Sequence, residues 1–398
     1  MSKAVPVIIA GAGPVGMVAA ADLVRRGIPV TVLEKMNDLS LESRASTFHP
    51  PTLDMLDDLG FAEALIAQGI KAPTVQYSTS EDGELGTFNF SAIADLTRHP
   101  YRVQSEQFKL TRIICDALKS NPLFTIRFGT PITSVTQDAD GVNVGLESNG
   151  SAEQCRCDWL IGADGASSIV RHTQQIEFDG FTWPERFLVM TTTFDFESAR
   201  PGVSSVSYVA DPVRWHFLLR IAGAWRVMMP VASEKSDDEA TSDAYIQESM
   251  GSVVPKGAKF DIKHITLYRV HQRVAKSFRH GRTFLAGDAA HINNPLGGMG
   301  MNGGIHDALN LSNRLGRVIL GQADEAALDS YDRQRRTVTM EAIQGDTIRN
   351  KRNLEARNES DRQQFRDQIR EAYSDPEKGR KLLRRIAMFD SLERAASL

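Results

Sequence analysis

The sequence predicts an α/β fold in which a parallel sheet is interrupted by a second, mostly antiparallel sheet and followed by a helical C-terminal region. Near the N-terminus, an apolar strand over 5–10 leads into a glycine turn, a helix and another apolar strand, which is the order of a βαβ unit. Between 173 and 273 the pattern changes to short alternating runs separated by turn residues, as in antiparallel strands. Beyond about residue 331 the chain is highly charged, and its apolar residues recur at helical spacing.

The individual elements follow from these patterns in chain order. A helix extends from the glycine turn to Arg26, and the second strand covers 28–34. Two later strands end in glycine and an acidic residue, one before Asp164 and one at Asp288. The antiparallel strands are expected over 187–196, 203–209, 213–221 and 225–231. Apolar helix faces are expected from Phe365, Ile369 and Tyr373, and from Leu382, Leu383, Ile386 and Phe389.

The composition is that of a globular protein and excludes several classes of function. The chain has 398 residues, of which 41% are hydrophobic and 24% charged. Its 46 basic and 50 acidic residues are mixed throughout and give a net charge of −4, so we expect no nucleic-acid partner. No apolar run approaches the roughly 20 residues that span a bilayer, so we expect a cytoplasmic protein with no membrane partner. Cys155 and Cys157 lack the spacing of a zinc or redox motif, and no metal site is expected.

The glycine turn at the first strand end predicts a dinucleotide site. Gly11 permits the tight turn, Gly13 lets the backbone approach a pyrophosphate, and Gly16 allows close packing of the helix. The helix start offers N–H groups and a positive dipole end to the phosphates, and Glu34 is placed to accept hydrogen bonds from a ribose. The contacts expected here come from Gly11, Gly13, Pro14, Val15, Gly16, Glu34 and Lys35. This unit, of the Rossmann type, does not by itself distinguish FAD from NAD.

Two further segments resemble a known family, the single-component flavoprotein aromatic hydroxylases with the para-hydroxybenzoate hydroxylase fold. The run Asp164-Gly-Ala-Ser-Ser-Ile-Val-Arg171 is similar to the DG motif of that family. The run from Gly287-Asp288 to Pro295-Leu-Gly-Gly-Met-Gly-Met-Asn302 is similar to its GD motif. With the glycine turn, these motifs extend the resemblance from the start of the chain to about Tyr331. Ser167 departs from the family pattern, in which a large polar residue is frequent, and this weakens the assignment of a nicotinamide path.

The resemblance implies FAD as the cofactor and assigns residues to it. The aspartate matching Asp288 binds the ribityl chain in the family, and the loop over 295–302 lies against the isoalloxazine ring. Backbone N–H groups of such a loop, which leads into a helix, suit an anionic reduced flavin. The further FAD-contacting positions implied are Arg44, Gln107, Asp164, Gly287, Asp288, Pro295, Gly298, Gly300, Met301 and Asn302.

The motifs and the strand pattern together predict three regions. The FAD-binding domain is discontinuous and is expected to comprise 1–72, 101–172 and 274–340. A substrate domain is expected from 73–100 and 173–273, and a C-terminal helical region from 341–398. The charged C-terminal helices are a candidate interface for a homodimer.

The resemblance further implies an FAD-dependent monooxygenase that hydroxylates a small activated aromatic ring of the phenol, hydroxybenzoate or hydroxypyridine type. NADH or NADPH would reduce the flavin, and molecular oxygen would react through a flavin C4a-hydroperoxide. Two alternatives stay open. One is an FAD-dependent oxygenase or epoxidase that acts on a larger natural product, and the other is a non-catalytic FAD-binding protein.

The group that activates the substrate is expected in the antiparallel sheet, where a polar side chain on an apolar wall can hydrogen-bond a phenol. The catalytic candidates are His216, Tyr208, Arg220 and Tyr268, together with Pro295 from the glycine-rich loop. Strand alternation separates His216 from its neighbours Trp215 and Phe217, but it does not say which face is the pocket. His291 is expected to support the loop, and His49 lies either near the active site or at a helix cap.

Overall fold

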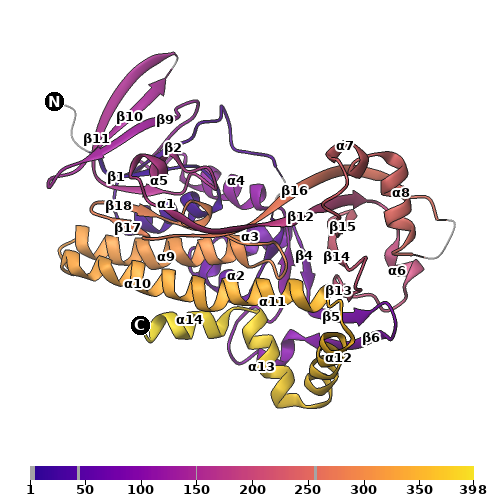
Figure 1. The fold of residues 1–398 in the computed structure, drawn as a ribbon. Coiled ribbons are helices and arrows are strands. Elements are labelled where there is room, and N and C mark those ends of the chain that lie inside the picture. The colour runs from indigo at the N-terminus through magenta and orange to yellow at the C-terminus, as the bar shows by residue number, and fades with distance from the viewer. Residues whose placement is uncertain (1–4, 43–44, 149, 255–257) are drawn as a thin grey trace.

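The computed structural model describes the chain except for residues 1–4, 43–44, 149 and 255–257 (Figure 1). Arg44, which the resemblance assigns to the flavin, lies outside the described residues. The predicted fold class is confirmed, because a mainly parallel sheet and a mainly antiparallel sheet are joined and followed by helices. Within the described part of the chain, no helix is long and apolar enough to cross a membrane.

The parallel sheet brings four strand ends into one row. Its main order is β17-β18-β11-β1-β2-β8, and the antiparallel strands β9 and β10 extend it from β11. Ala10 of β1 is paired with Leu33 of β2 and Gly162 of β11, and Gly162 is paired with Leu285 of β18. The residues that follow these positions therefore meet at one edge of the sheet. The strands are β1 (Val5–Ala10), β2 (Val30–Leu33), β8 (Phe124–Arg127), β9 (Ile132–Gln137), β10 (Val142–Ser148), β11 (Ser151–Gly162), β17 (Arg279–His280) and β18 (Thr283–Leu285).

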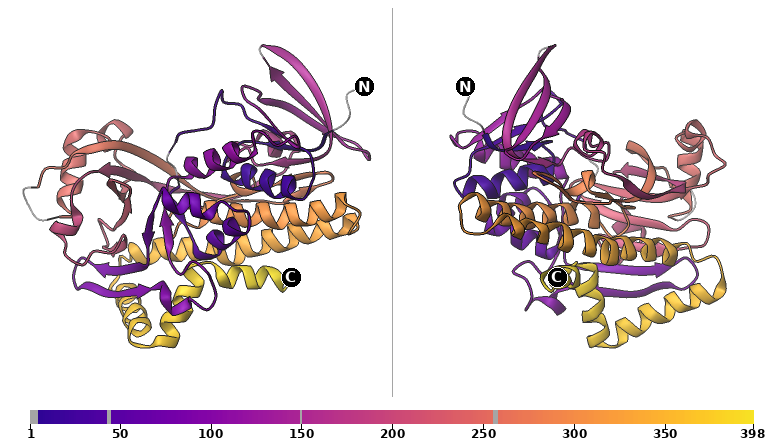
Figure 2. Two further views of the ribbon diagram at one scale, coloured as in Figure 1. Left: turned by 180° about the vertical axis from the view of Figure 1, so that it is seen from behind. Right: turned by 60° about the vertical axis from the view of Figure 1, so that its left-hand side comes forward.

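Helices cover this sheet because their apolar faces need a partner. α1 (Pro14–Arg25) follows the glycine turn and is buried over most of its length, and it packs on α9 (Met299–Ile319) and α4 (Gln107–Leu118). The long helix α9 and helix α10 (Asp329–Val338) lie side by side, as all views of the ribbon show (Figures 1 and 2).

The second sheet has the order β19-β16-β12-β15-β14-β13-β5-β6. All its pairs are antiparallel except β13 with β5. The hairpin over 74–89 thus joins strands that lie more than a hundred residues later in the chain. The strands are β5 (Thr74–Thr79), β6 (Gly83–Asn89), β12 (Phe178–Thr192), β13 (Val206–Ala210), β14 (His216–Ile221), β15 (Ala224–Val231), β16 (Ile262–Ala275) and β19 (His291–Ile292).

The two faces of the second sheet pack against different partners. On the outer face, Leu188, Leu218 and Val227 form a core with residues of α6 (Phe196–Ala199) and α8 (Asp243–Gly251). The sequence pattern did not predict these helices, nor α7 (Asp237–Ala240). The inner face packs toward the loop after β19 and the C-terminal helices, and its buried residues include Phe187, Tyr208, Phe217, Met228 and Val270.

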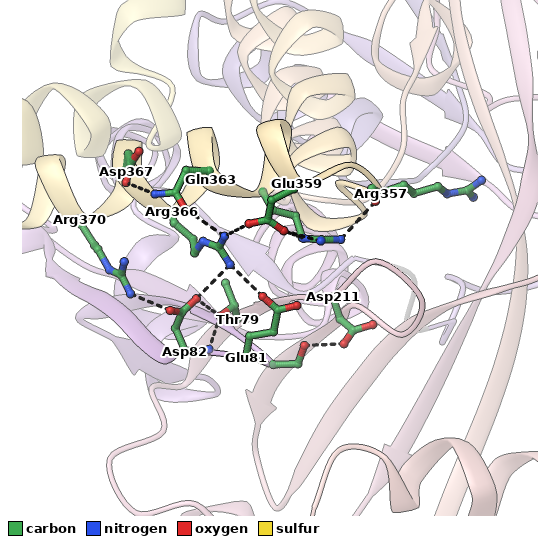
Figure 3. Close-up of polar contacts among 12 residues, drawn as sticks. Thr79, Glu81, Asp82, Asp211, Arg357, Glu359, Gln363, Arg366, Asp367 and Arg370 are labelled. Atoms are coloured by element: carbon green, nitrogen blue, oxygen red, sulfur yellow. Dashed lines mark hydrogen bonds and ion pairs between the residues drawn. The ribbon is translucent and has the colours of Figure 1, made fainter.

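The C-terminal region is helical and closes over the β5–β6 hairpin (Figure 2). Its elements are the π-helix η4 (Thr339–Gln344), α11 (Gly345–Leu354), α12 (Glu359–Ser374), α13 (Pro376–Ile386) and α14 (Phe389–Ala396). Arg366 of α12 contacts Glu81 and Asp82 at the hairpin tip (Figure 3). Phe365 and Ile369 are buried as expected from their spacing, whereas Tyr373 is 59% exposed.

Candidate active site

The glycine turn after β1 is built so tightly that two of its glycines cannot be replaced without clashes. Gly11 has a φ of 97°, and a Cβ there would lie 2.5 Å from the carbonyl oxygen of Ala163. A Cβ on Gly16 would lie 2.1 Å from the carbonyl oxygen of Gly11. A Cβ on Gly13 would meet nothing within 4 Å. The space beside Gly13 is therefore open for a bound group.

The start of α1 lacks a capping side chain. Gly13 is its N-cap residue, Pro14 follows at the first helical position, and no side-chain cap bond is found among the described residues. The Glu34 carboxylate at the end of β2 accepts hydrogen bonds from Ala12 N at 2.8 Å and Met36 N at 3.0 Å. Free helix N–H groups beside a carboxylate suit a pyrophosphate and a ribose. Lys35 is exposed next to Glu34.

Several buried polar atoms have no hydrogen-bond partner among the residues that the structure describes. They include Gln104 Nε2 at the end of β7 (Arg102–Gln104), Ser105 Oγ directly after that strand, and Asp164 Oδ1. Burial raises the pKa of Asp164, although Ser168 and the backbone N–H of Val170 hydrogen-bond its carboxylate. Unpaired buried polar atoms are costly and indicate a missing ligand. These atoms, with the open glycine turn, fit a polar dinucleotide such as FAD.

A buried ionic network holds the segment that carries Gly287 and Asp288. Asp307 of α9 accepts from Gly287 N at 3.1 Å, contacts His291 Nε2 at 2.7 Å and accepts from Arg335 Nε at 2.6 Å. Gly287 has a φ of 60°, and a Cβ there would lie 2.7 Å from Val15 Cγ2. Asp288 follows in η2 (Gly287–Ala289) and is exposed. His291 is thus part of a supporting network, which is the position expected for it.

The glycine-rich loop leads into α9 through two left-handed glycines, Gly297 with a φ of 104° and Gly298 with a φ of 68°. Asn302 ties this loop to β3 (Thr47–Phe48). Its Nδ2 donates to Thr47 O at 2.8 Å and to Gly298 O at 2.6 Å, and its Oδ1 accepts from His49 N at 3.0 Å. The Asn302 side chain therefore already makes three hydrogen bonds within the protein. Gly300 and Met301 lie beside it in the first turn of α9, and Pro295 is exposed at the tip of the loop.

His49, which follows β3, supports the same loop. It caps α2 (Pro50–Asp58) without a side-chain bond, and its Nε2 lies 2.9 Å from Gly297 O. Burial and the nearby Arg102 hold the pKa of His49 well below its usual range. The imidazole ring is therefore uncharged at neutral pH, and its Nε2–H donates to the carbonyl oxygen of Gly297. Gln107, at the start of α4, is half-buried, and its backbone N–H donates to Ala45 O at 2.9 Å.

The inner face of the second sheet presents an aromatic wall to this loop. Tyr208 stacks on Phe217 with ring centroids 4.6 Å apart and on Tyr77 at 5.4 Å. Burial raises the pKa of Tyr208, and the nearby Arg102 side chain and Gly297 backbone oppose that shift. The Tyr208 hydroxyl thus lies beside the glycine-rich loop, while the rings around it exclude water.

A buried arginine stands on the same face as Tyr208. Arg226 of β15 is 9% exposed, and its Nη1 donates to Ser46 Oγ at 2.9 Å. Burial lowers the pKa of Arg226, and Glu106 opposes that shift. Sequence reasoning missed this residue, although a lone arginine at an inward position of the apolar strand over 224–231 was a usable signal.

The structure does not bring the other substrate-domain candidates to this place. Strand register puts Phe217 on the inner face, so His216 and Arg220 point to the outer face. His216 contacts Arg200 at 3.3 Å, and its pKa falls to about 4 through burial and that arginine. Arg220 forms an ion pair with Glu197. Tyr268 lies on the inner face and acts on the pKa of Arg226, but it is four strand steps from Tyr208, which is roughly 19 Å.

The nucleotide edge and the aromatic wall together define a flavoprotein of the aromatic-hydroxylase class. A family model described as FAD binding domain matches residues 4–346. The chain therefore belongs to this family of FAD-binding proteins, and the expected resemblance is confirmed.

Individual relatives are similar over nearly the whole chain. The para-nitrophenol 4-monooxygenase of Pseudomonas sp. (strain WBC-3) is 33% identical over 344 residues, which are 84% of this chain and 83% of that protein. The 6-hydroxy-3-succinoylpyridine 3-monooxygenase of Pseudomonas putida (strain DSM 28022 / S16) is 32% identical over 360 residues, 89% of this chain and 90% of that protein. The crystal structure of p-nitrophenol 4-monooxygenase from Pseudomonas putida DLL-E4 superposes with a TM-score of 0.92 at 30% identity, and the match covers 98% of this chain and 99% of that one.

Proposed function

We propose that this enzyme hydroxylates a small phenol or hydroxypyridine at the aromatic wall, with FAD as cofactor and NADH or NADPH as reductant. The observation that carries the proposal is the place of the Tyr208 hydroxyl, which lies beside Gly297 on a largely apolar wall. The two relatives described above act, by their names, on a nitrophenol and a hydroxypyridine.

FAD would be held by residues from four strand ends. The uncapped start of α1 and the open space at Gly13 would take the pyrophosphate, and Glu34 the ribose. The backbone of Gly298 to Asn302 and the segment at Asp288 would take the flavin end. When bound, FAD supplies the electrons and the activation of oxygen that the protein itself lacks.

The protein's own groups would bind and orient the ring. Tyr208 would hydrogen-bond the substrate hydroxyl and so favour its ionised, electron-rich form, since Arg102 stands behind the tyrosine oxygen. Phe217 and Met228 would pack on the ring and exclude water. Arg226 would hold the segment at Ser46 against the wall.

The test is product formation by the purified holoenzyme with 4-nitrophenol and with a 6-hydroxypyridine, followed by mass spectrometry and NAD(P)H oxidation. We expect a ring compound to accelerate oxidation and to gain one oxygen atom. Tyr208→Phe should lower kcat/KM by about 10- to 100-fold, which corresponds to the loss of one hydrogen bond to a charged group. Tyr268→Phe is the matched comparison. A loss in Tyr268→Phe with none in Tyr208→Phe would move the substrate to the other end of the sheet, and an enzyme that binds FAD but oxidises no ring would contradict the proposal.

The homodimer and the cytoplasmic location expected from the sequence stay predictions. Light scattering on the purified protein would test whether it forms a homodimer.

A further inference from the structure

A cavity of about 220 Å³ lies between the start of α9 and the C-terminal helices. Met299, at the start of α9, is the one lining residue that belongs to a segment proposed to bind FAD. Tyr208 and Arg226 do not line the cavity. Its lining residues are Met299, Glu341, Ala342, Ile343, Asp346, Arg349, Arg385, Met388, Asp390 and Ser391.

One side of the cavity is apolar. Met299, Ile343 and Met388 are each at most 2% exposed and form a small core of their own, apart from the larger cores of the molecule. This core is set tightly against α9, because a Cβ on Gly303 would lie 2.8 Å from Ile343 Cδ1 and 3.9 Å from Met388 Cε. The apolar side of the cavity is therefore held in a fixed position.

Among the described residues, the ion pairs around the cavity leave one guanidinium group, that of Arg385, without a partner. Its three carboxylates are already paired: Glu341 with Arg394 at 2.9 Å, Asp390 with Arg384 at 3.1 Å, and Asp346 with Arg349. Arg385 forms no side-chain hydrogen bond or ion pair among the described residues, and Arg349 Nε is buried without a hydrogen-bond partner. Burial and then the neighbouring Arg385 lower the pKa of Arg349, so the two guanidinium groups repel each other. An anion between them would remove that repulsion.

Two rare backbone conformations frame the same cavity. The π-helix η4 supplies Glu341, Ala342 and Ile343. Met388 has a φ of 73°, and among the described residues only Gln175 shares a positive φ without being glycine. Such conformations cost free energy and concentrate at functional sites. Their convergence here, together with the unpaired donors, indicates a built site rather than a packing defect.

We propose that this cavity binds a small organic anion with an apolar body, of the aromatic carboxylate or phenolate class, through Arg385 and Arg349. The anionic group would lie between the two guanidinium groups, and the ring would pack on Ile343 and Met388. The site is distinct from the aromatic wall, although its walls contact that region: Asn350 Nδ2 donates to Leu296 O at 3.3 Å, and Arg102 Nη2 donates to Ile386 O at 3.0 Å. The proposal does not depend on hydroxylation, because binding requires no turnover.

Methionine methyl NMR of the holoenzyme tests this site separately from the catalytic one. Met388 reports on the cavity, and Met228, on the inner face of the sheet, reports on the aromatic wall. Benzoate is the probe, benzamide is its neutral counterpart, and Met388→Leu assigns the signal. We expect benzoate to shift the Met388 methyl saturably, and benzamide to require at least tenfold higher concentration.

Charge variants decide the role of the arginines. Arg385→Gln should raise the benzoate concentration at half-saturation of the Met388 shift at least tenfold, and Arg385→Lys should restore part of the affinity. Lys381→Gln is the matched control, since Lys381 is exposed on the same helix outside the cavity. The proposal is overturned if benzoate shifts Met228 alone, or if Arg385→Gln and Lys381→Gln titrate alike at Met388. Inactivity of the enzyme on every ring compound would leave the Met388 result as it stands.

Discussion

Asp307 accepts a hydrogen bond of 2.6 Å from Arg335 Nε, and both side chains are at most 1% exposed. The other carboxylate oxygen of Asp307 contacts His291 and the backbone N–H of Gly287. The segment over 287–291, which is proposed to bind the flavin part of FAD, is therefore held in place by one buried carboxylate.

Replacement of this carboxylate should destabilise the protein and remove a pH dependence. Burial alone would raise the pKa of Asp307, but Arg335 and His291 outweigh it and lower that pKa. The stabilisation is then fully present above the unfolded-state pKa of about 4 and declines as pH falls from there through the lower folded-state pKa. We expect Asp307→Asn to lower the free energy of unfolding by about 3 to 5 kcal/mol at neutral pH. Urea unfolding of the parent protein and of Asp307→Asn at pH 7 and pH 3.5 checks this prediction. If acidification lowers the free energy of unfolding equally in the two proteins, the prediction is contradicted.

The glycine turn allows a fold effect to be separated from a cofactor effect. A Cβ on Gly16 meets Gly11 O at 2.1 Å, whereas a Cβ on Gly13 meets nothing. Gly16→Ala should therefore lower stability by about 3 kcal/mol. Gly13→Ala should leave the urea midpoint unchanged and weaken FAD at least tenfold, because the new methyl group would occupy the space assigned to the pyrophosphate. Equal FAD affinity in Gly13→Ala and the parent enzyme would remove that assignment.

Arg226 should matter for turnover more than Arg220, although both are arginines of the same sheet. Arg226 joins the inner face to Ser46, while Arg220 pairs with Glu197 on the outer face. Loss of a charged hydrogen bond predicts a fall in kcat/KM of about 10- to 100-fold for Arg226→Met. Arg220→Met should stay within about twofold. Steady-state kinetics of both variants, with the substrate identified by the experiment proposed above, checks this prediction. Comparable losses of kcat/KM in Arg226→Met and Arg220→Met would mean that the inner face does not form the pocket.

Arg366 should hold the C-terminal helices on the hairpin. Its guanidinium is 9% exposed and reaches Glu81 at 2.9 Å, Gln363 at 3.0 Å and Glu359 (Figure 3). Arg370, one turn further on α12, is 50% exposed and reaches Asp82 at 3.0 Å. We expect Arg366→Ala to lower the thermal midpoint and to speed proteolysis within α12, while Arg370→Ala changes both little. Identical digestion of the two variants would show that other contacts hold the helix.

The features that the sequence predicted are those set by local backbone chemistry. Gly11 and Gly16 are recognisable because the turn they form tolerates no side chain, wherever it occurs. Helical spacing likewise predicted the burial of Phe365 and Ile369. Helices α7 and α8 were missed, although Ser236 and Glu239 form a capping box that marks the start of the first.

The sequence by itself determined the fold class, the family and the strand ends that surround the cofactor, because each depends on residues close together in the chain. The tertiary structure alone decided which face of the second sheet is the wall. Alternation separates Phe217 from His216 and Arg220, but either set could have faced the loop, and the strand register then placed Tyr208 beside Phe217. The choice was made when the opposite face packed on α6 and α8, and the same packing brought Arg226 to Ser46, 180 residues away in sequence. Contacts at that separation depend on the register of whole elements, which no local pattern specifies.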